Sequence, residues 1–522
     1  MNRRQRRAGA AAGGGPAGLT PAFVEIFNRA LALQQAGRLP EAEALYRQAM
    51  AMNPNVALLY SNLGVVMYAQ GGVAESIPFY QKAIALDPTL SLAHNNLGVA
   101  LSALGRLEEA LAAFSKTIAL VPDDPEPTNN YGDVLVKMSR FAEAAAVLER
   151  ALRLRPNYVE AYTNLGTAYW GLGRLDDAVA CFRRAIAIAP DTAMAHKNLG
   201  IVMLLTNNFA EGWREYEWRN AADKILPRNY PFPEWQGQPL PAGKKLLVWA
   251  EQGVGDEILQ AGMIGDLLER GFELIYEVDP RMVALMRRSF PAAQVVARAF
   301  PHPPETLVPA VGAHISAASM GRHLRLKIED FHKDRHSYLL ADRDRSAALR
   351  ARLNLAPGEK LVGLSWVSTN LNFGRSKSIS LAQWAPILKT PGVKFVDLQY
   401  GDTAAERAAV AAELGVEVIH VDGLDLRDDL DGFAALTAAC DLVITVSNST
   451  AHFAGALGVP VWIFVSAGVG KFWYWGLTAP TVPWYPSATL IRQNAAQDWT
   501  PSLAHAAARL AEVVAGASPL TR

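Results

Sequence analysis

Hydrophobic and small residues recur with a period of 34 residues over roughly the first 220 positions of this chain. A proline and, ten residues later, a glycine mark each period, at Pro54, Pro88, Pro122, Pro156 and Pro190 and at Gly64, Gly98, Gly132, Gly166 and Gly200. A period of this length fits two antiparallel helices, and such a pair cannot bury its apolar face without neighbouring pairs. The pattern therefore predicts an α solenoid of about six repeats between about residues 23 and 223.

Two further columns of residues follow the same period. Small residues occupy Ala42, Ser76, Ala110, Ala144, Ala178 and Gly212, and bulky apolar residues occupy Tyr46, Tyr80, Phe114, Leu148, Phe182 and Tyr216. Small side chains let paired helices approach closely, and bulky ones fill the space between them. With the 34-residue period, these columns are the signature of tetratricopeptide repeats.

One asparagine in each repeat stands on the predicted first helix, which lines the concave face of a solenoid. The column consists of Asn28, Asn62, Asn96, Asn130, Asn164 and Asn198. A primary amide donates and accepts hydrogen bonds at once, so a ladder of amides can bind the backbone of an extended peptide. The column resembles the asparagine ladder of the O-linked N-acetylglucosamine transferases. The alternative is that asparagine belongs to the generic repeat pattern as a polar residue on an exposed face.

The second half of the chain alternates short apolar runs with amphipathic segments. Apolar runs at 245–250, 274–278, 361–366, 393–398, 416–421, 441–446 and 459–465 read as strands with helices between them. This alternation predicts parallel sheets covered by helices on both faces. Two such doubly wound domains facing a cleft form the GT-B architecture, with the ligand at the carboxyl ends of the strands. The expected organisation is a disordered basic tail (1–20), the solenoid (21–223), a proline-rich connector (224–243), an acceptor-side domain (244–350), a donor domain (351–515) and a short tail (516–522).

The loop Gly253-Val254-Gly255-Asp256 follows the first strand. A dinucleotide fingerprint is not supported, because its third glycine would fall on Ile258. The loop resembles that of heptosyltransferase-like enzymes, which implies that Asp256 is the general base. An ordinary helix N-cap is the structural alternative for this aspartate.

The segment from Asp441 to Pro460 runs from a buried strand through a polar turn into a helix rich in small residues. The free N–H groups at the start of such a helix suit a diphosphate. Heptosyltransferase-like enzymes have the same succession of strand, polar turn, histidine and small-residue helix. The resemblance implies that Asn448, Ser449, Thr450 and His452 hold the phosphates or the sugar of a donor, whereas the small residues alone would be explained by tight packing.

A long loop from Ser365 to Ser378 is a third candidate element, because loops of this length are usually functional. It contains Trp366, Asn370, Arg375 and Lys377. With no metal-ligand cluster evident, we expect Arg375 or Lys377 to neutralise the leaving phosphate, without a metal or other cofactor. Ser365 and Trp366 belong to the same expected donor site, and Gln399 is a candidate contact for the nucleotide base.

Together, these segments resemble bacterial tetratricopeptide-repeat glycosyltransferases with a heptosyltransferase-like catalytic half, a group that includes flagellin glycosyltransferases. The resemblance implies a protein O-glycosyltransferase whose repeats capture an acceptor polypeptide, such as flagellin, while the cleft holds a nucleotide sugar. Two alternatives are a transferase acting on a lipid-linked or surface glycan and a scaffold whose transferase half has lost activity.

Composition narrows the setting of this activity. Lys and Arg number 50, and so do Asp and Glu, which argues against a nucleic-acid partner. Cys181 and Cys440 are the two cysteines, a number that suits a reducing compartment. No long uncharged apolar stretch or signal peptide is evident, so the sequence predicts a cytoplasmic protein without a membrane span.

Overall fold

The structure is a computed structural model that describes residues 20–225, 228–300, 302–331, 336–369, 374–467, 472–494 and 496–520. The predicted basic tail therefore lies outside the described residues, except for Thr20. The chain divides into two compact units, Met1–Ala195 and His196–Arg522.

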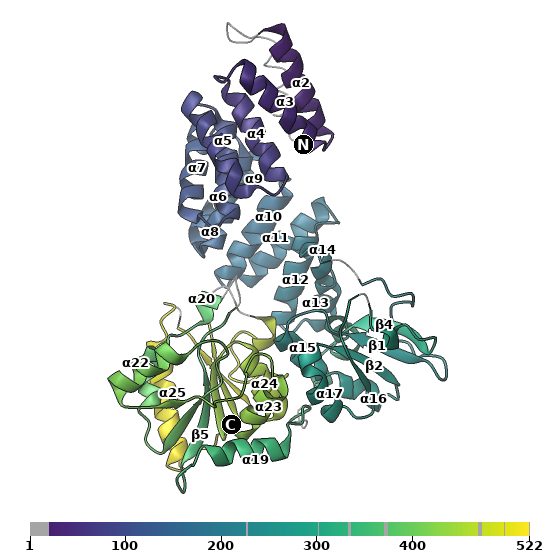
Figure 1. The fold of residues 1–522 in the computed structure, drawn as a ribbon, viewed down its shortest axis with the longest axis vertical. Helices are drawn as coiled ribbons and strands as arrows, with labels where there is room; N and C mark the ends of the chain where they lie inside the picture. Colours follow the sequence, from purple (N-terminus) through teal and green to yellow (C-terminus); the bar gives the residue numbers. More distant parts are fainter. Residues whose placement is uncertain are drawn as a thin grey trace. The chain divides into compact units, whose positions relative to one another are not determined.

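The first unit consists of paired antiparallel helices, as the period predicts (Figure 1). Their bounds are α2 (Pro21–Gln35), α3 (Leu39–Met52), α4 (Ala57–Ala69), α5 (Val73–Leu86), α6 (Ser91–Ala103), α7 (Leu107–Leu120), α8 (Pro125–Lys137), α9 (Phe141–Leu154), α10 (Val159–Gly171) and α11 (Leu175–Ile188). Each proline of the period ends a repeat. The residue before it is the C-cap of the second helix and is extended at Asn53, Asp87, Arg155 and Ala189, with φ near −147° at Asn53 and −141° at Asp87.

The periodic glycines allow the two helices of a repeat to touch. A Cβ atom at Gly64 would lie 2.6 Å from the ring of Tyr80, and one at Gly98 would lie 2.7 Å from the ring of Phe114. Gly132 and Gly166 face Leu148 and Phe182 in the same way. The glycine column and the bulky column thus form one repeated contact, and close packing of this kind tolerates no added methyl group.

The second unit begins inside α12 (Ala193–Leu205) and includes α13 (Phe209–Tyr216) and α14 (Arg219–Ala222). The sequence places these helices with the repeats, and α13 also packs against the α/β part. Trp213 is 2% exposed, packs edge-on against Trp473 and donates its indole N–H to the carbonyl of Arg325 at 2.8 Å. Phe209 packs against Phe331 in the same cluster.

The α/β part contains two fully parallel sheets, which confirms the predicted fold class. The first has the order β3-β2-β1-β4 and the second the order β10-β9-β8-β5-β6-β7. The strands are β1 (Lys245–Trp249), β2 (Leu274–Val278), β3 (Gln294–Ala297), β4 (Val311–Ser316), β5 (Lys360–Ser365), β6 (Val393–Asp397), β7 (Val418–Ile419), β8 (Leu442–Val446), β9 (Val461–Val465) and β10 (Ala488–Arg492). Strands β3, β4 and β10 were not foreseen from the apolar runs.

Helices cover both faces of the second sheet (Figure 1). The helices of the α/β part are α15 (Val254–Ala261), α16 (Ile264–Glu269), α17 (Val283–Ser289), α18 (Gly321–Leu324), α19 (Arg343–Arg352), α20 (Gly374–Lys377), α21 (Ala385–Leu388), α22 (Ala404–Leu414), α23 (Leu430–Ala439), α24 (Ser449–Leu457) and α25 (Thr500–Val514). Two short helices, α15 and α16, follow β1 and are separated at Gly262 and Met263.

The proline-rich connector contains no helix or strand among its described residues, 224–225 and 228–243, and Pro227 lies outside them. Its Trp235 is fully buried, and its backbone N–H bonds to the carbonyl of His314 on β4 at 2.8 Å.

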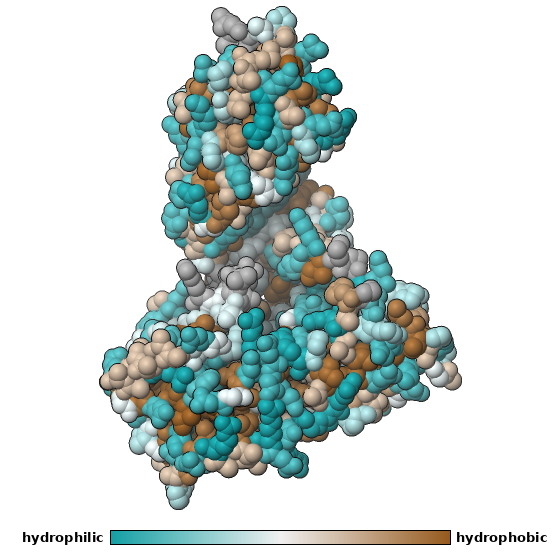
Figure 2. Space-filling model, viewed as in Figure 1, coloured by the Kyte–Doolittle hydropathy of each residue, from teal (hydrophilic) through white to brown (hydrophobic). Residues whose placement is uncertain are grey.

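Within the described residues, no helix is long and apolar enough to cross a membrane. Figure 2 shows hydrophilic and hydrophobic residues interspersed over the face in view.

Candidate functional site

A cavity of about 340 Å³ lies where loops from both sheets meet, a volume in the range of small-molecule sites. One wall comes from the loop after β1 and the start of α15, with Gly253, Gly255 and Asp256. The facing wall comes from the loops after β5 and β8, with Ser368 and Asn448. The strand order reverses between β1 and β4 in the first sheet and between β8 and β5 in the second. The cavity therefore lies at topological switch points, where α/β proteins bind ligands.

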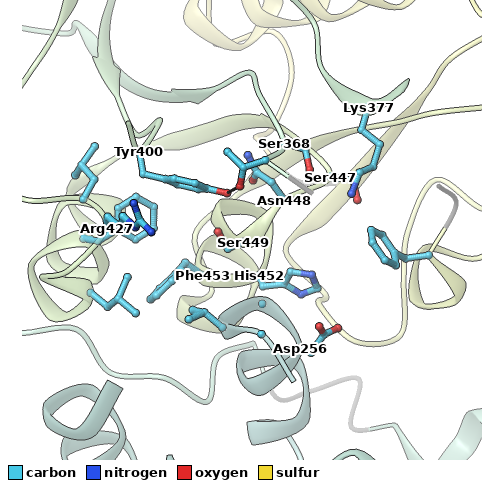
Figure 3. A pocket seen from close by; sticks show the side chains of 18 of the residues that line it. Asp256, Ser368, Lys377, Tyr400, Arg427, Ser447, Asn448, Ser449, His452 and Phe453 are labelled. Atoms are coloured by element: carbon cyan, nitrogen blue, oxygen red, sulfur yellow. Dashed lines mark hydrogen bonds between the residues drawn. The ribbon is translucent and has the colours of Figure 1, made fainter. Parts of the chain in front are cut away.

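Asp256 enters the cavity from α15 (Figure 3). The helix begins at Val254 with Gly253 as its N-cap, so Asp256 lies in the first turn and makes no side-chain cap, which removes the N-cap alternative. Burial raises the pKa of Asp256 to about 6, and the negative charge of Glu251 adds to the rise, while the positive charge of Lys377 opposes it. A carboxylate with this pKa is suited to accept a proton near neutral pH.

His452 lies on α24 and faces Asp256 across the cavity (Figure 3). Its ring is 3% exposed, stacks on Trp475 and has Nδ1 2.8 Å from the hydroxyl of Tyr485. Burial, together with the charge of Lys377, lowers the pKa of His452 to about 3, so the imidazole is neutral. A neutral imidazole can serve a ligand as a hydrogen-bond partner but does not contribute a positive charge.

The amino end of α24 also borders the cavity, through Ser447, Asn448 and Ser449. Asn448 caps the helix. Its Oδ1 accepts from the N–H of Thr450 at 3.0 Å, and its Nδ2 donates to Ser365 Oγ at 2.7 Å and to the carbonyl of Val367 at 3.1 Å. The Asn448 amide is thus engaged within the protein, and Thr450 is fully buried. Of the four residues expected to hold the donor, Ser449 and His452 are placed to meet a ligand with their side chains.

Ser365, Trp366 and Gln399, which are expected to contact the donor, are buried and are not among the residues that line the cavity. Gln399 is 4% exposed, and its Oε1 accepts from Ser365 Oγ at 2.9 Å and from the N–H groups of Trp366 and Val367. Trp366 is buried and donates its indole N–H to Glu406 at 2.6 Å. These hydrogen bonds hold the loop after β5 in place.

Lys377, from α20, lines the cavity with Phe472, and its ammonium lies 4.3 Å from the centre of that ring. Burial lowers the pKa of Lys377 to about 8, and the charge of Asp256 opposes this fall. The lysine is therefore largely protonated at neutral pH. Asn370 and the side chain of Arg375 lie outside the described part of the chain.

Arg281 and Arg427 also line the cavity, and the sequence analysis missed both. Arg281 donates to Asp279 at 3.0 Å and to the carbonyl of Arg427 at 3.0 Å, so it links the two sheets' loops. No motif marks either arginine. With Lys377, they give a basic lining in which Asp256 is the one carboxylate among the described lining residues.

Aromatic residues complete the lining, at Tyr400, Phe433, Phe453, Phe472 and Tyr474. Phe472, Trp473, Tyr474 and Trp475 form a run of four aromatic residues. Phe472 and Tyr474 do line the cavity, whereas Trp475 is fully buried. Among the described residues, no group of three or more His, Cys, Asp or Glu side chains could hold a metal ion.

A second cavity, of about 580 Å³, lies within the first unit along α8 and α10. Asn130 and Asn164 of the asparagine column line it with Asn129, Tyr158 and Glu160. The Nδ2 of Asn164 donates to Asn129 Oδ1 at 3.1 Å, and the Nδ2 of Asn130 donates to Asn95 Oδ1 at 3.3 Å. The amides of Asn130 and Asn164 therefore each bond to the preceding repeat and are not independent groups.

The column is also uneven in exposure. Asn28 is exposed, Asn96, Asn130 and Asn164 are half-buried, and Asn62 and Asn198 are 8% and 9% exposed. Asn130 and Asn164 thus combine partial exposure with a place in the lining of a cavity.

The fold and these two cavities define a tetratricopeptide-repeat protein whose repeats precede two parallel α/β sheets. Residues 27–91, 131–193 and 163–212 match one tetratricopeptide repeat family, and residues 88–157 match another. The chain is related to Protein FlbA of Caulobacter vibrioides, with 37% identity over 341 residues that cover 60% of this chain and 54% of that protein. The chain thus spans about half the length of this relative.

Solved structures similar to this chain include several repeat proteins. YrrB, a TPR protein with an unusual peptide-binding site, is 23% identical and covers 34% of this chain and 93% of its own, with a TM-score of 0.29. MamA is 25% identical over 31% of this chain and 96% of its own, with a TM-score of 0.29. PilF of Pseudomonas aeruginosa is 19% identical over 39% of this chain and 93% of its own, with a TM-score of 0.35.

Proposed function

We propose that this chain is a protein O-glycosyltransferase of the GT-B class. In this proposal the cavity of the second unit binds a nucleotide sugar, the repeats bind an acceptor polypeptide, and Asp256 takes the proton from an acceptor Ser or Thr hydroxyl. The hydroxyl oxygen forms a bond to the anomeric carbon, and the nucleotide leaves with the electrons of the broken glycosidic bond.

The position and the pKa of Asp256 are the main support for this proposal. Its carboxylate faces a cavity of ligand size and has a pKa of about 6. The described residues show no hydrogen bond from this side chain to another group of the protein, unlike the engaged amides of Asn448 and Gln399. A half-buried carboxylate that the fold leaves without such a partner is typical of a catalytic base.

The remaining lining fits the diphosphate of a nucleotide sugar. Lys377, Arg281 and Arg427 supply positive charge, and the amino end of α24 adds N–H groups and a favourable dipole. Such groups stabilise the charge that develops on a leaving phosphate. The aromatic side chains of Tyr474 and Phe472 offer flat surfaces for a sugar or a base.

The cavity along α8 and α10 supports the acceptor part of the proposal. Its floor of half-buried amides offers hydrogen bonds to a peptide backbone, while Asp133, Glu160 and Arg155 provide charged groups at the same cavity. Flagellin, which the family resemblance suggests, is the first acceptor to test.

The test is intact-mass analysis of candidate acceptors co-expressed with this chain and a donor pathway. A mass increase that requires Asp256 supports the proposal. If sugar is transferred to a glycan or lipid carrier and no protein is modified, the acceptor in this proposal is wrong but the transfer reaction is retained. A chain that binds no nucleotide and releases no product from any nucleotide sugar would be a scaffold.

A further inference from the structure

Charged and aromatic side chains of α13 and α14 contact the loop that leads into α15, the helix that carries Asp256. We infer that this segment, residues 209–222, is a structural part of the catalytic half, and that Arg219 is a positioning residue that fixes the Glu251–Gly255 loop and thereby Asp256. The inference rests on the proposed function for the role of Asp256, but its structural part stands on the contacts themselves.

Arg219 and Glu251 form a buried ion pair. Their side chains are 2% and 3% exposed, with Arg219 Nε 2.5 Å from Glu251 Oε1 and Arg219 Nη2 3.0 Å from Glu251 Oε2. This paired geometry fixes both distance and orientation. Arg219 also donates to Ser319 Oγ at 2.8 Å, and Ser316 donates to Glu251, so the end of β4 holds the same carboxylate.

The rest of the network leaves little freedom to Arg219. Glu217 accepts from Arg219 at 2.9 Å, from Ser319 at 3.0 Å and from Arg322 at 3.2 Å. Arg322 continues to Glu234 in the connector at 2.8 Å. Breaking a buried pair of this kind leaves an uncompensated charge, so the partners must stay together in the folded chain.

A second line of contacts reaches the same loop through side-chain amides. The Nε2 of Gln260 donates to Gln252 Oε1 at 3.2 Å, and the Nε2 of Gln252 donates to the hydroxyl of Tyr216 at 3.3 Å. Tyr216 and Trp213 pack against Trp473, which is adjacent in sequence to the cavity residues Phe472 and Tyr474. Residues of α13 thus touch elements on both sides of Asp256.

The ion pair also sets the charge that Asp256 experiences. Glu251 raises the pKa of Asp256, and Arg219 neutralises Glu251. The other groups around Asp256 are the cations Lys377, Arg281 and Arg427, the neutral His452 and the un-ionised Tyr216, Tyr474 and Tyr485. A change at Arg219 should therefore alter both the position and the protonation of Asp256.

The experiment uses the full chain with Arg219→Gln, Arg219→Lys, Glu251→Gln and the double variant Arg219→Gln/Glu251→Gln. Arg214→Gln is the matched control, because Arg214 lies on α13 with its side chain 70% exposed. Amide hydrogen exchange over residues 250–257 reports on the loop without requiring activity. Product release from a panel of nucleotide sugars, with water as acceptor, reports on chemistry as a function of pH.

We expect exchange over 250–257 to rise in Arg219→Gln and to stay at the parent level in Arg214→Gln. Turnover should fall about 10- to 100-fold with a smaller change in KM, since displacement of a reacting group acts on the chemical step. The acid limb of the profile of turnover against pH should move to higher pH by roughly half a unit in Arg219→Gln, because Glu251 is then unpaired. It should move to lower pH by a similar amount in Glu251→Gln, because the negative charge of Glu251 is then removed. Arg219→Lys keeps the charge and should leave the limb in place.

The positioning role of Arg219 is overturned if amide hydrogen exchange over residues 250–257 is unchanged in Arg219→Gln. It is also overturned if the acid limb of turnover against pH lies at the same pH in all variants. If Arg219→Gln does not fold, Arg219→Lys and the double variant decide the same two readouts. A parent chain that turns over no nucleotide sugar counts against the proposed function instead, while the exchange result still decides whether Arg219 fixes the loop.

Discussion

A Cβ atom at Gly255 would lie 3.0 Å from Cδ2 of His452, so the start of α15 and the helix α24 approach each other to the limit that a glycine allows. Gly255 precedes the proposed base, and His452 is buried against Trp475 and Tyr485 on the opposite wall. The contact therefore sets the width of the cavity beside Asp256.

Replacing Gly255 by Ala should push His452 away by a few tenths of an ångström. We expect the chain to fold and to bind nucleotide, but turnover should fall about 10-fold or more, because small displacements at a reacting centre are costly. Gly253→Ala is the comparison, since nothing lies within 4 Å of a Cβ atom there. An equal loss in both variants would show that the contact with His452 is not responsible.

Asp256→Asn should remove the proposed base and lower turnover by roughly 100-fold or more. In the parent, turnover should rise with pH through about 6, because Asp256 accepts a proton only when ionised. Steady-state rates of product release between pH 4.5 and 8 test both points. Equal turnover in the variant would leave Asp256 with a structural role.

Asp256→Asn should also change the thermal stability of the chain. Burial raises the folded-state pKa of Asp256, so the folded chain holds an unfavourable ionised carboxylate above about pH 6. This destabilisation disappears as the pH falls below the ordinary aspartate pKa of about 4. Asp256→Asn should therefore have a higher Tm than the parent at pH 8 and a similar Tm at pH 4. A lower Tm at pH 8 would contradict the burial of an unpaired charge.

The sequence was a good guide wherever one local pattern decides the structure. The 34-residue period required paired helices, and Gly98 against Phe114 shows the contact that enforces it. The alternation of apolar runs and helices required parallel sheets, and the loop after β1 placed Asp256 at a switch point. These features depend on residues close in the chain.

Features that depend on distant residues were not predictable in this way. Asn448 and Gln399 looked like donor contacts, yet Asn448 bonds to Ser365, 83 positions away, and Gln399 bonds to the same serine. Arg281 reaches the cavity from the loop after β2 and has no motif of its own. Polar side chains near a site can serve the ligand or the loop, and only the three-dimensional partners distinguish the two roles.

Lys377 should be the main cation for the donor phosphates, because it is buried beside the cavity and remains largely charged at neutral pH. We expect Lys377→Met to weaken nucleotide binding about 10- to 100-fold, the effect of losing one charge-assisted hydrogen bond. Calorimetry with UDP, GDP and CMP, with and without chelator, measures this. Lys389→Met, at an exposed position, is the control.

If chelator abolishes nucleotide binding, the proposal that side chains supply the positive charge is wrong. If Lys377→Met binds as tightly as the parent, Arg281 or Arg427 holds the phosphates instead. In that case the corresponding glutamine variants should show the loss.

The last prediction concerns the interlinked amides of the repeats. Changing Asn96, Asn130 and Asn164 together to Ala should preserve the helices, because alanine is the better helix former. It removes the bonds from Asn130 to Asn95 and from Asn164 to Asn129, so a small fall in Tm is expected. Each hydrogen bond lost between an asparagine amide and the peptide should cost about 1 kcal/mol, so the three substitutions should weaken acceptor binding on the order of 100-fold.

Nucleotide binding should not change in the triple variant, and Asn55→Ala on an exposed turn should have no effect on the binding of either ligand. Fluorescence anisotropy with labelled acceptor peptides and calorimetry with nucleotide measure the two sites separately. A triple variant that binds and modifies its protein acceptor as well as the parent would reduce the column to a structural link between repeats, because its internal hydrogen bonds would then be the whole reason for the asparagines.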